Sequence, residues 1–262
     1  MTSGTESPVR RGLLPTHTAR RIMRDFVDRG LQPGEALADE ATLVERYGVS
    51  RGTLREALRL LTFLGAITVK AGPSGGPRLA TPGPSVVGSA LGMVVQFRGA
   101  TLRTVFEARL AIEPAAAALA AVHRKDGDLE LLDETAAALM AAQRRRGPEY
   151  ARLATRHMSQ VAEASHNEVL ATMVPALAAM HMTVPWRYPQ GSRVELAKRV
   201  RTCVEAIRIG DGTSASEITR GMLTLLIDDV ERNQRTQLEQ RILWPDMDEV
   251  MSGERLAPWA EG

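Results

Sequence analysis

The stretch Tyr47-Gly48-Val49-Ser50-Arg51-Gly52-Thr53-Leu54-Arg55-Glu56-Ala57-Leu58 decides the fold of the N-terminal part of this 262-residue chain. Ser50 is expected to cap a helix over residues 51–64, because its hydroxyl can accept a hydrogen bond from a first-turn amide. Three arginines share one stripe of that helix, each about 40° from the last: Arg51, Arg55 and Arg59. Its leucines form a separate apolar stripe, so one face can be buried while the arginine face stays in water.

The flanking sequence supplies the rest of a small domain. Apolar residues three and four apart predict a helix over residues 16–29, and Asp39 can cap a second, short helix that ends before Gly48. Two short β-like runs, residues 66–70 and 77–81, surround a Gly/Pro loop and predict a hairpin. The order helix, helix, turn, helix, hairpin indicates a winged helix-turn-helix domain over residues 16–80, after a disordered lead over residues 1–15.

An arginine-bearing helix in this setting suits DNA, because arginine pairs with the guanine edge in the major groove and with phosphates. Hydroxyl groups at the helix start can donate to phosphate, and hairpin glycines allow close backbone approach. The expected DNA contacts are Ser50, Arg51, Thr53, Arg55, Arg59, Lys70, Gly75, Gly76 and Arg78. Taken alone, the helix fits equally well an ordinary surface helix whose arginines meet solvent or Glu56; the whole arrangement favours DNA binding.

These residues, with Pro33-Gly34-Glu35-Ala36-Leu37 before them and Gly65-Ala66-Ile67 after them, resemble the GntR family of bacterial transcription regulators. The resemblance implies a homodimer that binds double-stranded DNA at a short palindromic operator, with contacts from Arg51, Thr53, Arg55 and the wing glycines. One position departs from the family pattern. An arginine often follows the glutamate of the second helix, but Ala41 stands there, so the operator is expected to differ from the common one.

The chain after residue 80 predicts a second, all-α domain. A Pro/Gly linker and an extra helix occupy residues 81–100, and residues 239–262 form a tail that the sequence does not place. Between them, apolar periodicity predicts an antiparallel all-α bundle, and the family resemblance given below implies that it has six to seven helices. The expected bundle helices cover residues 102–122, 129–146, 148–165, 168–181, 192–209 and 214–238. The fold class is therefore mostly α, with one small β-hairpin.

This second part resembles the FCD effector domain of the FadR subfamily, through Phe106-Glu107-Ala108-Arg109-Leu110-Ala111-Ile112-Glu113-Pro114 and Glu163-Ala164-Ser165-His166-Asn167-Glu168. The resemblance implies a cavity for a small-molecule effector. Many such domains bind a metal through one Asp and three His, and the matching positions here are Leu153, His157, Val200 and Leu225. One imidazole among three aliphatic side chains gives no reason to hold zinc or nickel, so we expect neither metal nor cofactor.

The expected effector-binding residues are Arg109, Leu153, His157, Asn167 and Val200. Arg109 matches a family position that often meets the acid group of the effector. A buried arginine needs an anion, either a ligand carboxylate or Glu113 four residues on, and the sequence slightly favours the internal pair. The aliphatic residues at the former ligand positions favour a relatively apolar effector, such as a carboxylic acid or an acyl thioester. An effector-independent domain that serves only dimerisation remains the alternative.

Composition and charge exclude several other classes. The chain has one cysteine, Cys203, which excludes a disulfide scaffold and fits a reducing compartment. Residues 1–80 carry 12 Lys and Arg against 8 Asp and Glu, while the remainder is slightly acidic, so an anionic partner is expected for the first part. The uncharged run after the linker spans about 20 Å as a helix, too short for a membrane. No catalytic constellation stands out. We expect a cytoplasmic repressor rather than an enzyme or membrane protein.

Overall fold

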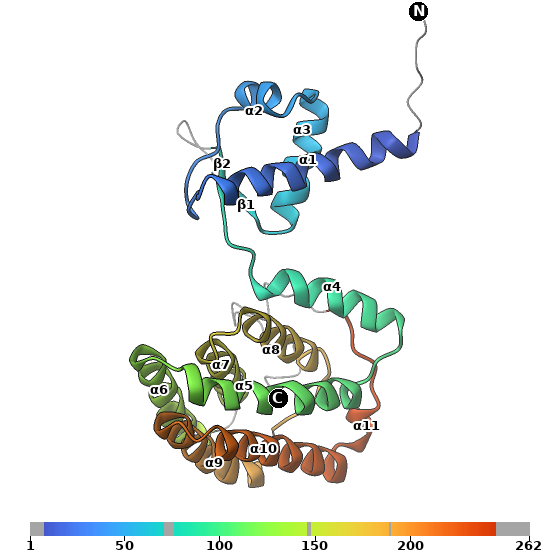
Figure 1. Cartoon of the computed structure of the whole chain (residues 1–262). Coiled ribbons are helices and arrows are strands. Elements are labelled where there is room, and N and C mark those ends of the chain that lie inside the picture. The colour runs from blue at the N-terminus through green and yellow to red at the C-terminus, as the bar shows by residue number, and fades with distance from the viewer. Residues whose placement is uncertain (1–7, 71–75, 146–147, 189, 245–262) are drawn as a thin grey trace, which may run out of the picture. The chain divides into compact units, whose positions relative to one another are not determined.

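The computed structural model describes residues 8–70, 76–145, 148–188 and 190–244. The chain divides into two compact units, Met1–Gly83 and Pro84–Gly262. The first holds three helices and a hairpin, and the second is a helical bundle (Figure 1).

The first unit is the expected winged helix-turn-helix. Its elements are α1 (Pro8–Asp28), α2 (Glu40–Tyr47), α3 (Arg51–Phe63), β1 (Ile67–Lys70) and β2 (Gly76–Leu79). Asp39 accepts from the amide of Thr42 to cap α2, and Gly48, with φ of 63°, ends that helix in the left-handed conformation. The three helices and the hairpin bury one core, which includes Ile22, Leu43, Leu54, Leu61 and Ile67.

The start of α1 corrects the sequence-based prediction. A disordered lead was expected over residues 1–15, but α1 begins at Pro8 and passes through Pro15. Apolar periodicity marks only the buried part of a helix, and from residue 14 onward, where burial is described, the first buried positions are Thr18 and Ala19. The earlier turns are held by backbone hydrogen bonds and carry no periodic signal. Residues 1–7 lie outside the described part of the chain.

The hairpin gains an edge that the sequence did not predict. Strands β1 and β2 pair antiparallel, with Ile67 opposite Leu79. The turn after α1 then lies along the other side of β2: the amide of Leu37 donates to the carbonyl of Pro77 at 2.9 Å, and that of Leu79 to Glu35 at 2.9 Å. This pairing anchors the base of the hairpin to the helices. The loop over residues 71–75 is outside the described residues.

The second unit is a bundle built around one central helix. Its elements are α4 (Pro84–Phe97), α5 (Leu102–His123), α6 (Asp126–Ala142), α7 (Glu149–Ala164), α8 (Glu168–His181), α9 (Gln190–Ile209), α10 (Gly212–Asn233) and α11 (Arg235–Leu238). Helix α5 packs against α7, α8, α9 and α10, and α4 packs on α8 (Figure 1). The mostly α class and the bundle, with α4 as the extra helix, are as predicted. The single helix expected over 214–238 is instead interrupted at Gln234.

The first residues of the predicted tail belong to this unit. The amide of Leu102 donates to the carbonyl of Gln240 at 3.0 Å, and that of Ile242 donates to Ala100 at 2.9 Å. Ile242 is fully buried, and the indole of Trp244 donates to the hydroxyl of Ser89 at 2.9 Å. No helix in the described ranges is long and apolar enough to span a membrane.

Candidate functional site

The N-terminus and one side of α3 form the first candidate site. The hydroxyl of Ser50 accepts from the amide of Thr53 at 3.2 Å, which caps the helix. Leu54, Ala57 and Leu61 are buried against the core. The three arginines on the neighbouring face are exposed: Arg51, Arg55 and Arg59. Helix α3 therefore has the two separate faces that the sequence predicts.

Two of these arginines form ion pairs in water. The Nε of Arg55 lies 3.1 Å from Oε1 of Glu40, and Nη1 of Arg59 lies 2.5 Å from Oε1 of Glu56. The arginine side chains are 62% and 75% exposed, so these pairs are weak and a phosphate can replace the carboxylate. Arg51 makes no ion pair with any residue that the structure describes. The contact between Arg59 and Glu56 is the one expected of an ordinary surface helix. It does not bury Arg59, so the arginine face of α3 stays accessible.

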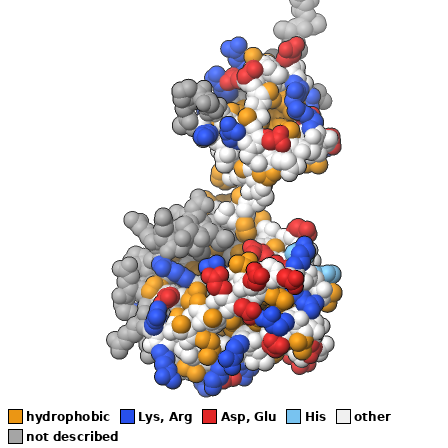
Figure 2. Space-filling model, turned by 90° about the vertical axis from the view of Figure 1, so that its left-hand side faces the viewer, with side chains coloured by type: hydrophobic (Ala, Val, Ile, Leu, Met, Phe, Trp, Pro, Cys, Tyr) orange, Lys and Arg blue, Asp and Glu red, His pale blue; other side chains and the backbone are white. Residues whose placement is uncertain are grey.

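The hairpin offers fewer side chains for DNA contact than the sequence predicts. Lys70 is exposed at the end of β1. Arg78 is only partly exposed, and its Nη1 donates to the carbonyl of Gly34 at 2.9 Å, so this side chain braces the turn after α1. Gly76 has φ of 129°, a conformation that favours glycine. Gly75 is outside the described residues. Lys and Arg side chains, with acidic ones between them, are spread over the face of this unit that Figure 2 shows.

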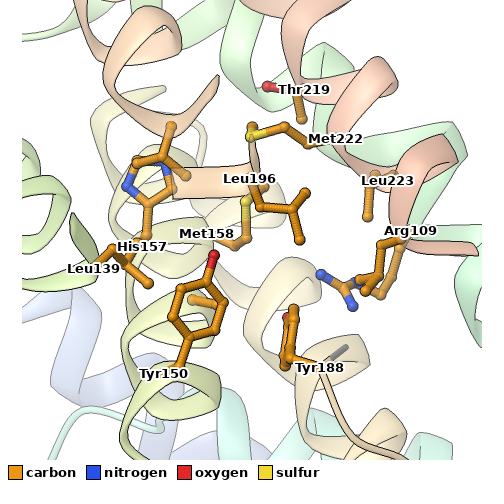
Figure 3. A pocket seen from close by; sticks show the side chains of 13 residues that line it. Arg109, Leu139, Tyr150, His157, Met158, Tyr188, Leu196, Thr219, Met222 and Leu223 are labelled. Atoms are coloured by element: carbon orange, nitrogen blue, oxygen red, sulfur yellow. The ribbon is translucent and has the colours of Figure 1, made fainter. Parts of the chain in front are cut away.

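A cavity in the second unit forms the other candidate site (Figure 3). It holds about 440 Å³ of space between atoms, part of which is open to solvent. Its walls come from α5, α6, α7, α9 and α10 and from the segment before α9. The lining residues are Arg109, Leu139, Tyr150, Ala154, His157, Met158, Tyr188, Leu196, Val200, Thr219, Met222, Leu223 and Leu226. Most of these side chains are aliphatic or methionine, so the cavity is mainly apolar.

Arg109 lies in this wall with its charge already neutralised. Its Nε is 2.5 Å from Oε1 of Glu113 and its Nη2 is 3.3 Å from Oε2, and both side chains are almost fully buried. Its Nη1 contacts Nδ1 of His181 at 3.3 Å. Burial alone would lower the pKa of Arg109, but the Glu113 carboxylate outweighs it and raises that pKa. Of the two anions considered from the sequence, the internal one is in place.

His157 is the unsatisfied polar group of the cavity. Its side chain is 1% exposed, and neither ring nitrogen has a hydrogen-bond partner among the described residues. Burial lowers the pKa of His157 to about 4, so the imidazole is neutral near pH 7. Tyr150, from the same helix, donates its hydroxyl to the carbonyl of Arg193 at 3.1 Å. Burial raises the pKa of both Tyr150 and Tyr188, so neither phenol ionises near neutral pH.

The structure brings three of the five expected effector residues together. Arg109, His157 and Val200 line the cavity. Leu153 is partly buried and packs on the core without lining the cavity. Asn167 has a different part: its Oδ1 accepts from the amides of Val169 and Leu170, both at 3.1 Å, and so caps α8.

Sequence reasoning missed several cavity residues. The clearest are Tyr150, Tyr188, Thr219 and Met222. Tyr188 lies between α8 and α9, where no periodic pattern exists to mark it as inward-facing. Glu40, the second-helix glutamate just before Ala41, pairs with Arg55 fifteen residues away, and no local sequence signal marks that pairing.

Leu153, Val200 and Leu225, which the family resemblance aligns with metal ligands, are aliphatic residues. Within the described ranges, no group of three or more His, Cys, Asp or Glu side chains is placed to hold a metal ion. His166, which lies beyond the end of α7, contacts Oδ2 of Asp128 through Nε2 at 2.8 Å.

Comparison with known proteins finds a family match in each of the two units. The pattern for bacterial regulatory proteins of the gntR family matches residues 14–74, and that for the FCD domain matches residues 104–225. The HTH-type transcriptional regulator Mce2R of Mycobacterium tuberculosis is 29% identical over 229 residues, covering 83% of this chain and 92% of the relative. An uncharacterized HTH-type regulator of Mycobacterium bovis, Mb0601, matches to the same extent. A solved structure of a Streptococcus agalactiae GntR protein, 24% identical, shares the fold with a TM-score of 0.63, over 84% of this chain and all of that one.

Proposed function

Because this chain belongs to the GntR family of transcriptional regulators and carries an FCD domain, we propose that it is a homodimeric repressor that a small molecule releases from a palindromic operator. The observation that carries this proposal is the exposed arginine face of α3, beside a buried apolar face and a capped N-terminus. A rigid helix of this kind can lie in the major groove with its arginines on base edges or phosphates.

The geometry at the start of α3 supports phosphate contacts as well. Ser50 and Thr53 lie where the helix N-terminus exposes amide donors and favours negative charge. The ion pairs of Arg55 and Arg59 are exposed to solvent, so exchange of the carboxylate for a phosphate costs little. Lys70 and the hairpin glycines add a second contact region. Arg78 is a weaker candidate, because it is committed to Gly34.

The cavity supports the effector-responsive half of the proposal. Its mainly apolar wall fits a relatively apolar, metal-independent effector, the class to which the carboxylic acids and acyl thioesters expected from the sequence belong. Binding there would bias the bundle toward one arrangement and change the spacing of the two DNA-binding domains of a dimer. The alternative, a domain that serves only dimerisation, is favoured by one observation: Arg109 already has its anion in Glu113.

The DNA-binding half can be tested with fragments selected from random DNA. Arg51→Ala combined with Arg55→Ala should weaken binding to the recovered site about 30-fold or more, because each well-placed arginine contributes about 1–3 kcal/mol of discrimination. Arg220→Ala, which removes an exposed arginine of α10, is the matched control and should bind as the unaltered chain does. Equal affinity of the double variant and the control for the selected site would refute the proposal.

A further inference from the structure

The cavity also constrains the chemistry of its ligand. Resting on the proposed effector role of this site, we propose that the effector is an uncharged, largely apolar molecule whose hydroxyl or amide group faces His157 and Tyr150. This excludes a carboxylate at the polar end of the cavity. It keeps the relatively apolar, metal-independent character of the proposed effector but replaces the carboxylic acid and the acyl thioester expected from the sequence with an alcohol or an amide.

Charge balance argues against an anionic ligand. Among the described residues that line the cavity, Arg109 has the only permanently charged side chain, and Glu113 pairs with it at 2.5 Å. His157 is neutral at the pH of the cell. A ligand carboxylate would therefore bring an uncompensated negative charge into a mainly apolar space, or would have to displace Glu113 from a fully buried position. Either change is costly, because a buried charge needs its own partner.

Hydrogen-bonding capacity selects the neutral group. A neutral imidazole offers one donor and one acceptor, and both nitrogens of His157 are unpartnered within the described structure. The hydroxyl hydrogen of Tyr150 is committed to the carbonyl of Arg193, so its oxygen offers only lone pairs to the cavity. The site is therefore best matched by a ligand group that both donates and accepts hydrogen bonds. Hydroxyl and amide groups do this, while carboxylates, esters and thioesters only accept.

The positions of the side chains separate this polar end from Arg109. Tyr150 and His157 lie seven residues apart on α7, on one side of the cavity, and the Tyr150 hydroxyl points into it (Figure 3). Arg109 approaches from the opposite side, with Leu196 and Met158 between them in this view (Figure 3). The apolar part of the ligand would lie against leucine and methionine side chains, which adapt readily to aliphatic shapes.

Burial of the His157 imidazole removes its hydration and so costs free energy on folding. A buried polar side chain without partners is destabilising, and a ligand that supplies both partners removes that cost. Ligand binding and protein stability are therefore coupled at His157. Removing the imidazole should stabilise the empty protein and, at the same time, abolish its preference for hydroxyl and amide ligands.

Thermal melts of the full-length protein at pH 7.5 test the proposal with two sets of compounds that share a carbon skeleton and differ in the polar group. One set is octanamide, 1-octanol and octanoate, and the other is 3-phenylpropanamide and 3-phenylpropanoate. We expect the amides and the alcohol to raise the melting temperature by about 3 °C at ten times the dissociation constant. The carboxylates should produce no shift.

His157→Leu should melt higher than the unaltered chain without ligand and should lose the response. His157→Gln keeps a hydrogen-bond donor and an acceptor and should retain part of the ligand-induced shift. His123→Gln, which alters an exposed residue of α5, is the control and should retain all of that shift.

Affinity for the selected operator, measured in the same samples, separates the two proposals. Stabilisation by the amide with unchanged operator affinity would support the ligand chemistry and contradict release by an effector. Equal or greater stabilisation by octanoate, or an undiminished response in His157→Leu, would overturn the ligand chemistry and leave the repressor proposal standing. Absence of any shift with all five compounds would also overturn it.

Discussion

Replacing Glu113 by glutamine would leave the Arg109 guanidinium buried without a counter-charge. Glu113 is 0% and Arg109 2% exposed, so water cannot substitute for the lost carboxylate. Removing one partner of a buried pair typically costs about 3–5 kcal/mol. Glutamine keeps one oxygen that can accept from Arg109, so we expect the lower end of that range, about 3 kcal/mol of unfolding free energy.

Urea unfolding followed by tryptophan fluorescence is a suitable assay. Trp186 reports on this region because its ring centroid lies 5.4 Å from that of Phe106 and 5.4 Å from that of His181. Glu107→Gln is the matched control, since Glu107 is an exposed residue of the same helix and should change stability by less than about 0.5 kcal/mol. Arg109→Met combined with Glu113→Leu should recover most of the loss, because it removes both charges.

The refuting result is a Glu113→Gln protein within about 1 kcal/mol of the unaltered chain. It would mean that Arg109 finds another anion or water, and the charge-balance argument about the cavity would fail with it.

Three further predictions concern local features. Stability should fall as the pH drops from about 6.5 to 4, because burial lowers the pKa of His157 to about 4 while the unfolded chain takes up the proton first. That single group accounts for about 3 kcal/mol, and His157→Leu should show a correspondingly flatter pH profile in urea unfolding; an unchanged profile would contradict the assignment. Gly48→Ala should destabilise by about 1 kcal/mol in thermal melts through its positive φ alone, since open space surrounds it; an unaltered melting temperature would contradict this. Ser50→Ala should cost about 1 kcal/mol by loss of the α3 cap and should also weaken operator binding, whereas Ser50→Asp should restore the stability but not the affinity.

The features that the sequence predicts well are those set by nearby residues. Asp39 and Ser50 cap α2 and α3 as expected, because capping depends on an oxygen two or three residues from its amide. The Arg109–Glu113 pair could also be predicted, because residues four apart share a helix face. Asn167 could have been recognised by the same local rule, because an Asn followed by Glu168 is typical of a helix start.

Features set by contacts between distant segments could not be predicted in this way. Tyr188 lines the cavity from a connecting segment, and Thr219 from α10. The extended segment beside β2 depends on hydrogen bonds of Glu35 and Leu37 to residues that lie forty or more positions later in the chain. Periodicity reports which face of an element is buried but not which other element covers it. The start of α1 shows another limit, since the residues before Thr16 form helical turns without an apolar pattern in the sequence.

Arginine modification by phenylglyoxal, read by mass spectrometry with and without the selected operator, tests the central claim most directly. All three arginines of the α3 face are exposed in the free protein and should react readily: Arg51, Arg55 and Arg59. Operator DNA should protect all three, while Arg220 on α10 should react equally in both samples. Full reactivity of the α3 arginines in the DNA-bound protein would contradict the account.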